Sequence, residues 1–364
     1  MKKTSLILLI TFLIFKITSA QYLYDEGYIQ TVSDDQATKS FTFKNLQIYP
    51  LIAEKQFIEA HCDIGKYTTL KEALEKKKIE ISETETIVNR DNINDNQINQ
   101  QLDDTINIAV QNNVIQQNDV QIQQQLNVNT GGSASVNKLY IQNISKDTIY
   151  IMAGEVVKGG KQDRVIAQDM IIPPNSKKID LSVFCVEKGR WKYKDKSKFD
   201  GYFSVASNNV RKTVIQKQNQ SAVWEEVDKT VKKNKAESNT GAYTNLVNSE
   251  NYQKDLKEYL QFFNMAINNT DNCIGFVGVS GDKIIGCDIF ATSELFKKQS
   301  EGILKGYITE AITSDSKPNV KFNEIEKYLN FILTSNADEQ NANIKSKGNQ
   351  FKHNNKKLHI TTFD

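Results

Sequence analysis

Two glycine-containing stretches near the middle of the chain carry the side chains best suited to bind a ligand. They cover residues 154–164 and 187–191, and apolar sequence typical of strands lies between them. The side chains that could contact a bound molecule are Lys161, Gln162, Arg164, Arg190 and Trp191. Guanidinium groups bind carboxylates and phosphates through paired hydrogen bonds, and an indole ring offers a stacking surface. The pattern predicts a site for a small anionic ligand.

The same stretches contain two carboxyl side chains, Glu155 and Glu187. If both lie in one cleft, one can donate a proton while the other accepts one, as general acid–base catalysis requires. An alternative function is therefore a hydrolase that uses Glu155 or Glu187 as its acid or base. A third interpretation is a structural or interaction protein, in which the Asn/Gln-rich insertion makes the contacts. In that case Arg164 and Arg190 could simply bind strand-end carbonyls and acidic side chains.

The glycines also suggest a nucleotide phosphate loop, but the spacing argues against it. In that motif a lysine directly follows the second glycine, whereas Gly160 separates Gly159 from Lys161 here. The residue after the lysine should carry a hydroxyl group for Mg²⁺, and it is Gln162.

The chain has few histidines that could bind a metal or take part in catalysis. His61, His353 and His359 are the three histidines, and none has metal-ligand spacing with a cysteine. We therefore predict no metal site, no cofactor and no Ser/His/Asp triad.

The elements that must position the two stretches indicate an α+β fold. Short apolar, β-branched segments predict strands over 138–144, 148–152, 164–172 and 179–186, and a hairpin over 274–279 and 283–290. Apolar residues at spacings of three and four predict helices over 221–233, 249–267, 292–311 and 322–333. We expect an antiparallel β-rich core, either a sandwich or a barrel-like sheet, with the C-terminal helices packed against it.

The remaining segments set the domain organisation. Residues 1–20 have the basic start, short apolar run and small-residue cleavage site of a signal peptide, which predicts export after cleavage near Ala20. Residues 21–335 are predicted to form one domain, with an Asn/Gln-rich low-complexity insertion over 89–135. Residues 336–364 are polar and predict a flexible tail.

Charge and cysteine content limit the partners. Loss of residues 1–20 lowers Lys+Arg from 46 to 43 against 44 Asp+Glu, a net charge of −1. Such a balance predicts no nucleic-acid partner, and the absence of a second long apolar run predicts no membrane span in the mature chain. The sequence leaves open the oligomeric state and the disulfide state of its four cysteines, which are Cys62, Cys185, Cys273 and Cys287.

The central motifs resemble a known family, the ARG and rhodanese-phosphatase-superfamily-associated domain family. The resemblance is carried by Gly154-Glu155, by residues 160–165 and 185–191, and downstream by Val210-Arg211, Val223-Trp224, residues 275–290 and Tyr307. The family has no established activity. Its association with ADP-ribosylglycohydrolases and rhodanese-phosphatases implies a link to ADP-ribose metabolism.

Overall fold

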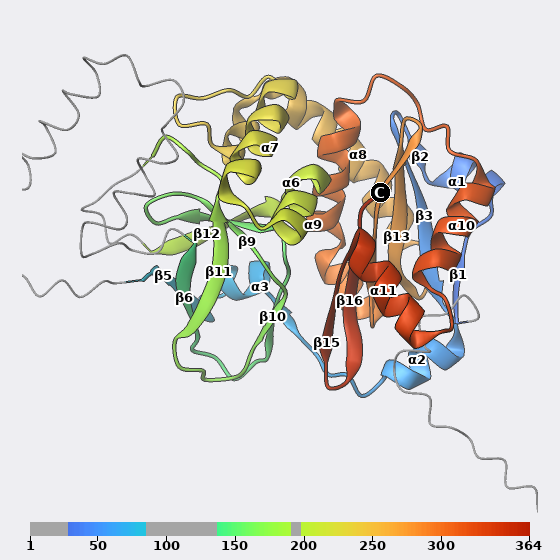
Figure 1. Cartoon of the computed structure of the whole chain (residues 1–364), viewed down its shortest axis with the longest axis horizontal. Helices are drawn as coiled ribbons and strands as arrows, with labels where there is room; N and C mark the ends of the chain where they lie inside the picture. Colours follow the sequence, from blue (N-terminus) through green and yellow to red (C-terminus); the bar gives the residue numbers. More distant parts are fainter. Residues whose placement is uncertain (1–27, 85–136, 191–197) are drawn as a thin grey trace, which may run out of the picture.

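A computed structural model describes residues 28–84, 137–190 and 198–364 (Figure 1). The predicted signal peptide, the Asn/Gln-rich insertion and Trp191 lie outside the described residues. All four cysteines lie within them and none forms a disulfide; Cys62 is exposed, whereas Cys185, Cys273 and Cys287 are buried.

The larger sheet is antiparallel and has the strand order β1-β3-β13-β14-β16-β15, with β2 paired to β3. Its strands are β1 (Ile29–Thr31), β2 (Thr42–Phe43), β3 (Leu46–Ala53), β13 (Cys273–Ser280), β14 (Lys283–Phe290), β15 (Gly348–His353) and β16 (Lys356–Thr362). The predicted hairpin is confirmed as β13–β14, which turns at Gly281 with a φ of +59°. That conformation suits glycine, which lacks the Cβ that opposes positive φ.

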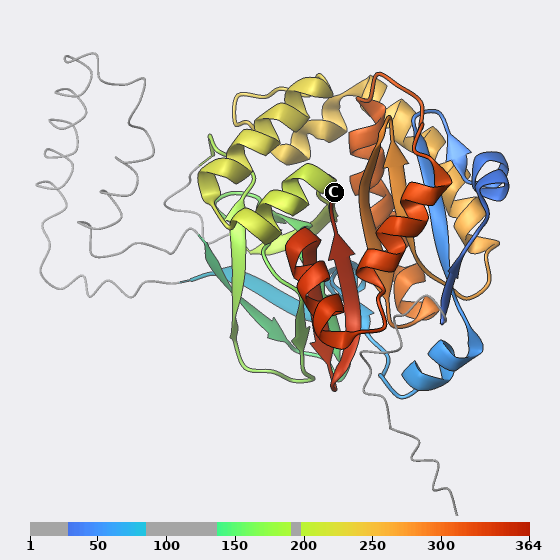
Figure 2. The same ribbon diagram turned by 45° about the vertical axis from the view of Figure 1, so that its right-hand side comes forward.

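Helices cover both faces of this sheet. The helices around the sheet are α1 (Asp34–Ser40), α2 (Lys55–His61), α8 (Glu250–Asn268), α9 (Ser293–Ile312), α10 (Phe322–Ile332) and α11 (Ala337–Lys347). Phe276 of β13 contacts Tyr307 of α9, whereas Tyr49, the register partner of the next residue Val277, contacts Phe322 of α10. Because successive strand residues point to opposite faces, α9 and α10 lie on opposite sides of the sheet. Figure 2 shows α10 and α11 in front of it.

The second body is a closed barrel with the strand order β11-β6-β5-β12-β8-β9. Its strands are β5 (Ile79–Glu83), β6 (Lys138–Asn143), β8 (Glu155–Gly159), β9 (Arg164–Ile166), β11 (Ile179–Cys185) and β12 (Phe199–Val205). A small sheet and a short helix adjoin it, formed by β4 (Thr68–Thr69), β7 (Ile149–Ile151), β10 (Met170–Ile172) and α3 (Leu70–Glu75). The α+β prediction with a barrel-like sheet is therefore confirmed.

One apolar core runs between the barrel and the larger sheet. Tyr150, Val156 and Phe184 from the barrel side belong to the same buried cluster as Phe276 and Phe290. The connecting elements are α6 (Asn208–Lys212), a π-helical turn η3 (Thr213–Lys217), α7 (Gln220–Lys233) and a 3₁₀ helix η4 (Tyr243–Asn248). Among the described residues, no helix is both long enough and apolar enough to cross a membrane.

The C-terminal segment differs from the predicted flexible tail. Residues 337–362 form α11, β15 and β16, and β16 pairs with β14 within the larger sheet. The prediction failed because Lys357, His359 and Thr361 are polar, yet the structure buries them. Leu358 and Ile360 alternate with these residues at the period of a strand, but the polar composition of residues 336–364 favoured a tail. In the structure both faces of β16 are covered.

Candidate functional site

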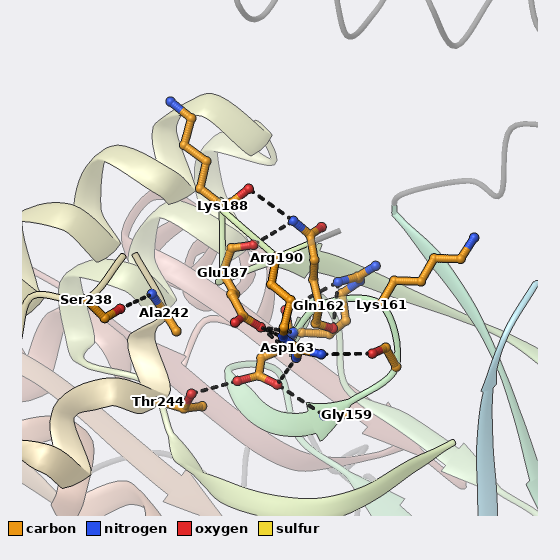
Figure 3. A network of polar contacts seen from close by, with 12 residues as sticks. Gly159, Lys161, Gln162, Asp163, Glu187, Lys188, Arg190, Ser238, Ala242 and Thr244 are labelled. Carbon is orange, nitrogen blue, oxygen red and sulfur yellow. Dashed lines mark hydrogen bonds and ion pairs between the residues drawn. The ribbon is translucent and has the colours of Figure 1, made fainter. Parts of the chain in front are cut away.

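The two glycine-containing stretches meet, as the sequence suggested they must for a shared site. The Gln162 side-chain amide donates a hydrogen bond to the Glu187 carbonyl at 2.6 Å, and the Asp163 N–H donates to Glu187 Oε2 at 3.2 Å. Arg190 Nη1 donates to the Gly160 carbonyl at 3.1 Å. We call this group the loop cluster; it comprises Gln162, Asp163, Arg164, Glu187 and Arg190, and Figure 3 shows it.

The arginines of the loop cluster bind acceptors within the protein. Arg190 Nη2 lies 2.6 Å from Glu187 Oε2 and 3.1 Å from Asp163 Oδ1, and its hydrogen bond to Glu187 raises the pKa of the guanidinium. Arg164 is fully buried and its Nη1 donates to the Gln162 carbonyl at 2.7 Å. Lys188 is exposed, and Figure 3 shows Lys161 and Lys188 extending away from the cluster.

The loop cluster also fixes the segment that follows it in the chain. Asp163 Oδ2 accepts a hydrogen bond from the Thr244 hydroxyl of η4 at 2.6 Å, and Gly189 N–H donates to the Thr240 carbonyl at 2.8 Å. A Cβ at Gly189 would lie 2.8 Å from the Thr240 Cα, so this close approach requires glycine. The arrangement links three loops through charged and main-chain groups.

The two predicted catalytic carboxyls belong to different networks. Glu187 binds Arg190 in the loop cluster. Glu155, at the start of β8, is fully buried and its Oε2 accepts a hydrogen bond from the Met152 N–H at 2.8 Å. Burial is the largest cause that raises the pKa of Glu155 to about 8, and the nearby Asp169 raises it further. Glu155 is therefore protonated at neutral pH.

Glu155 belongs to a second polar group, which lies between the barrel and the larger sheet. Its members come from five separate places in the chain, and each is buried: Glu155 in β8, Asp169 between β9 and β10, Arg211 in α6, Asp288 in β14 and His359 in β16. We call this group the buried cluster. Tyrosine hydroxyls complete it, because Tyr150 donates to Asp169 at 3.2 Å and Tyr307 donates to Asp288 at 2.9 Å.

His359 lies between two aspartates. Its Nδ1 is 2.8 Å from Asp169 Oδ2 and its Nε2 is 3.0 Å from Asp288 Oδ1. Burial alone would lower the pKa of His359, but the two carboxylates outweigh it and raise the pKa to about 9. A ring with a carboxylate at each nitrogen carries both protons, so His359 is a cation at neutral pH.

Arg211 supplies the second cation of the buried cluster. Its Nη1 and Nη2 donate to the two oxygens of Asp288 at 3.0 and 2.7 Å, which is bidentate geometry. Although burial opposes it, the charge of Arg211 together with His359 lowers the pKa of Asp288. Gly154 makes room for this side chain, since a Cβ there would lie 2.7 Å from the Arg211 Cγ.

Sequence reasoning missed four of the five residues of the buried cluster. Asp169 and His359 are 190 positions apart, and the four residues lie in separate segments of the chain, with His359 in the predicted tail. A usable signal existed, because Arg211 and Asp288 fall in the downstream segments that carry the family resemblance. Among the described residues, no group of three or more His, Cys, Asp or Glu side chains is placed to hold a metal ion.

Fold and site together define an α+β protein with a closed barrel, a helix-covered sheet and an acid–base cluster buried between them. The chain belongs to the ARG and Rhodanese-Phosphatase-superfamily-associated Protein domain family, whose match covers residues 36–362. The family resemblance seen in the sequence is thus confirmed. No curated protein and no solved structure matches the chain.

Proposed function

We propose that the protein is a hydrolase whose proton donor is Glu155. The observation that carries the proposal is the opposite behaviour of two buried carboxyls: the pKa of Glu155 is raised to about 8, while that of Asp288 is lowered. Environments that push the pKa values of neighbouring titratable groups apart are typical of acid–base sites.

Glu155 can donate its proton to the leaving group while the bond between the leaving group and the rest of the substrate breaks. Water supplies the hydroxyl group that replaces the leaving group, and the proton released from that water restores Glu155. His359 and Arg211 contact neighbouring groups rather than the carboxyl itself, so we assign them as positioning residues that balance the charges of Asp169 and Asp288.

Because the cluster is buried, substrate would reach Glu155 only after neighbouring elements move, and α9 packs against β12 next to Glu155. Two glycines of α9 allow this helix to pack closely against β12 and the residue that follows it. A Cβ at Gly302 would lie 2.8 Å from the Tyr202 hydroxyl, and one at Gly306 would lie 2.6 Å from the Ala206 carbonyl oxygen. The family description names ARG and rhodanese-phosphatase proteins, so conjugates of ADP-ribose and small phosphate esters are the first substrates to test.

The test is an activity panel on the purified chain with Glu155→Gln as the decisive variant. Because Glu155 is neutral at pH 7, the amide preserves shape and charge and removes only the transferable proton. Glu310→Gln is the matched control, since burial also raises the pKa of Glu310 but that residue lies outside the cluster and binds Asn209. Turnover that survives Glu155→Gln, or that Glu310→Gln abolishes equally, would overturn the assignment.

A second candidate is binding of a small anionic ligand at the outer side of the loop cluster. Lys161 and Lys188 extend outward there (Figure 3). It ranks second because a ligand would compete with Asp163 and Glu187 for Arg190. Calorimetric titration with ADP-ribose and sugar phosphates tests it: binding should weaken in Arg190→Ala, and no heat with either ligand would exclude these two classes.

Export is the third part of the proposal, since residues 1–20 have the pattern of a signal peptide. Expression of the full chain in an exporting host should give a mature protein that begins at Gln21. N-terminal sequencing of exported and retained fractions decides this, and a retained protein that begins at Met1 would contradict it.

A further inference from the structure

A pocket of about 230 Å³ lies where α2 and the segment after it face the start of α9. It shares no lining residue with the loop cluster or the buried cluster. Its volume is just below the range of about 300–1,000 Å³ common for drug-sized ligands, which suits a smaller molecule.

The walls of the pocket are largely apolar and partly aromatic. Phe57, Ile58, Ile274 and Leu295 line it, and the Phe57 ring stacks on His61 with centroids 4.1 Å apart. Ile58 remains 42% exposed although it is large and apolar. A ligand with a ring or a branched aliphatic body would bury this surface, and burial of apolar area is the main source of affinity in such pockets.

The polar lining favours a negative charge on that ligand. Lys66 is exposed and Lys298 lies 3.1 Å from Glu294, so the basic side chains of the lining outnumber the acidic one. Burial lowers the pKa of His61, and its Nδ1 lies 2.9 Å from the Phe57 carbonyl, which can only accept, so Nδ1 carries a proton.

The first turn of α9 adds main-chain donors to the same wall. Thr292 caps the helix by accepting a hydrogen bond from the Leu295 N–H at 3.2 Å. The N–H groups of Ser293 and Glu294 have no acceptor within the helix, because the residues four positions earlier lie outside it, and both residues line the pocket. We propose that this pocket binds a small monocarboxylate with an apolar body, with the carboxylate toward Lys66 and the start of α9 and the body against Phe57 and Ile58.

The test uses phenylacetate, its neutral analogue phenylacetamide and the cation benzylamine with the full chain. Calorimetry should show phenylacetate binding at least about tenfold more tightly than either analogue. Cys62 gives a second readout, because it lines the pocket and is exposed while the other three cysteines are buried. Bound phenylacetate should slow the reaction of Cys62 with a thiol reagent.

Ile58→Glu should weaken phenylacetate binding about tenfold or more, since it removes apolar contact and adds a repelling charge. Lys66→Glu should act in the same direction. Met265→Glu is the matched control: Met265 is 63% exposed and lies on α8 outside the pocket, so binding should be unchanged. Equal affinity for phenylacetate and phenylacetamide, no protection of Cys62, or unchanged binding in Ile58→Glu would overturn the proposal.

Discussion

The loop cluster and the buried cluster both join arginines to carboxylates, yet they differ in what surrounds the charges. The Arg190 side chain of the loop cluster is 27% exposed, and the hydrogen bond to Glu187 is the largest cause of its shifted pKa. In the buried cluster, Glu155 is fully covered and desolvation is the largest cause. In the loop cluster, the charged side chains therefore hold neighbouring loops together. In the buried cluster, removal from water raises the pKa of a carboxyl group.

The largest expected effect on stability comes from removing Arg211, the cation that balances the charge of Asp288. Arg211→Ala should lower the free energy of unfolding by about 3–5 kcal/mol, because it leaves a buried carboxylate without its bidentate partner. Urea unfolding measures this. Lys138→Ala is the control, since its ion pair with Asp180 is exposed and should cost less than about 1 kcal/mol. Equal effects in the two variants would break the distinction between buried and exposed pairs.

A smaller loss of stability is expected from a substitution at Gly154, where the backbone makes room for Arg211. Gly154 has a φ of +90°, and an added Cβ would collide with the Arg211 side chain at 2.7 Å. Gly154→Ala should therefore cost about 2–4 kcal/mol from strain and overpacking together. Gly241→Ala provides the matched control, because its φ is +58° and its added Cβ would meet only Asp228 Oδ1 at 3.7 Å. If urea unfolding shows that Gly154→Ala loses no more stability than Gly241→Ala, the Arg211 side chain moves aside without cost.

Glu155 and His359 should each stabilise the protein less as the pH rises from about 5 to about 9. The folded-state pKa of Glu155 is raised from 4.5 to about 8 and that of His359 from 6.5 to about 9. Both groups hold more protons in the folded state. Their contributions are thus complete below the unfolded values and are lost as pH rises through the folded ones, by up to about 1.4 kcal/mol per pH unit for each group.

Glu155→Gln sharpens this prediction because it removes one of the two groups. The dependence of the unfolding free energy on pH should become flatter between pH 5 and 8, while the part near pH 9, which belongs to His359, should persist. Urea unfolding at several pH values measures both parts. An unchanged profile would assign the dependence to another residue.

The smallest expected effect on stability comes from a substitution in the loop cluster. Arg190→Ala should cost about 1–2 kcal/mol, since the side chain is partly exposed and Asp163 keeps its hydrogen bond from Thr244. A loss larger than that of Arg211→Ala, again by urea unfolding, would reverse the comparison.

The sequence by itself determined most of the local structure. Residues 252–267 repeat apolar side chains at helical spacing, and α8 buries Tyr252, Leu256, Tyr259, Phe263 and Ile267. Turn chemistry at Gly281 fixed the β13–β14 hairpin, and the motifs at residues 154–165 and 185–191 identified the family. These predictions succeeded because periodicity and turn preference depend on residues close together in the chain.

Only the tertiary structure decided which polar residues share an environment. Glu155 and Glu187 come from neighbouring motifs but lie in separate networks, whereas Glu155, Asp288 and His359 come from three distant strands and lie in one. Pairing of β16 with β14 brings His359 to Asp288, and the packing of the barrel on the sheet excludes water from both. The pKa of a carboxyl depends on that exclusion of water, and no local pattern in the sequence records it.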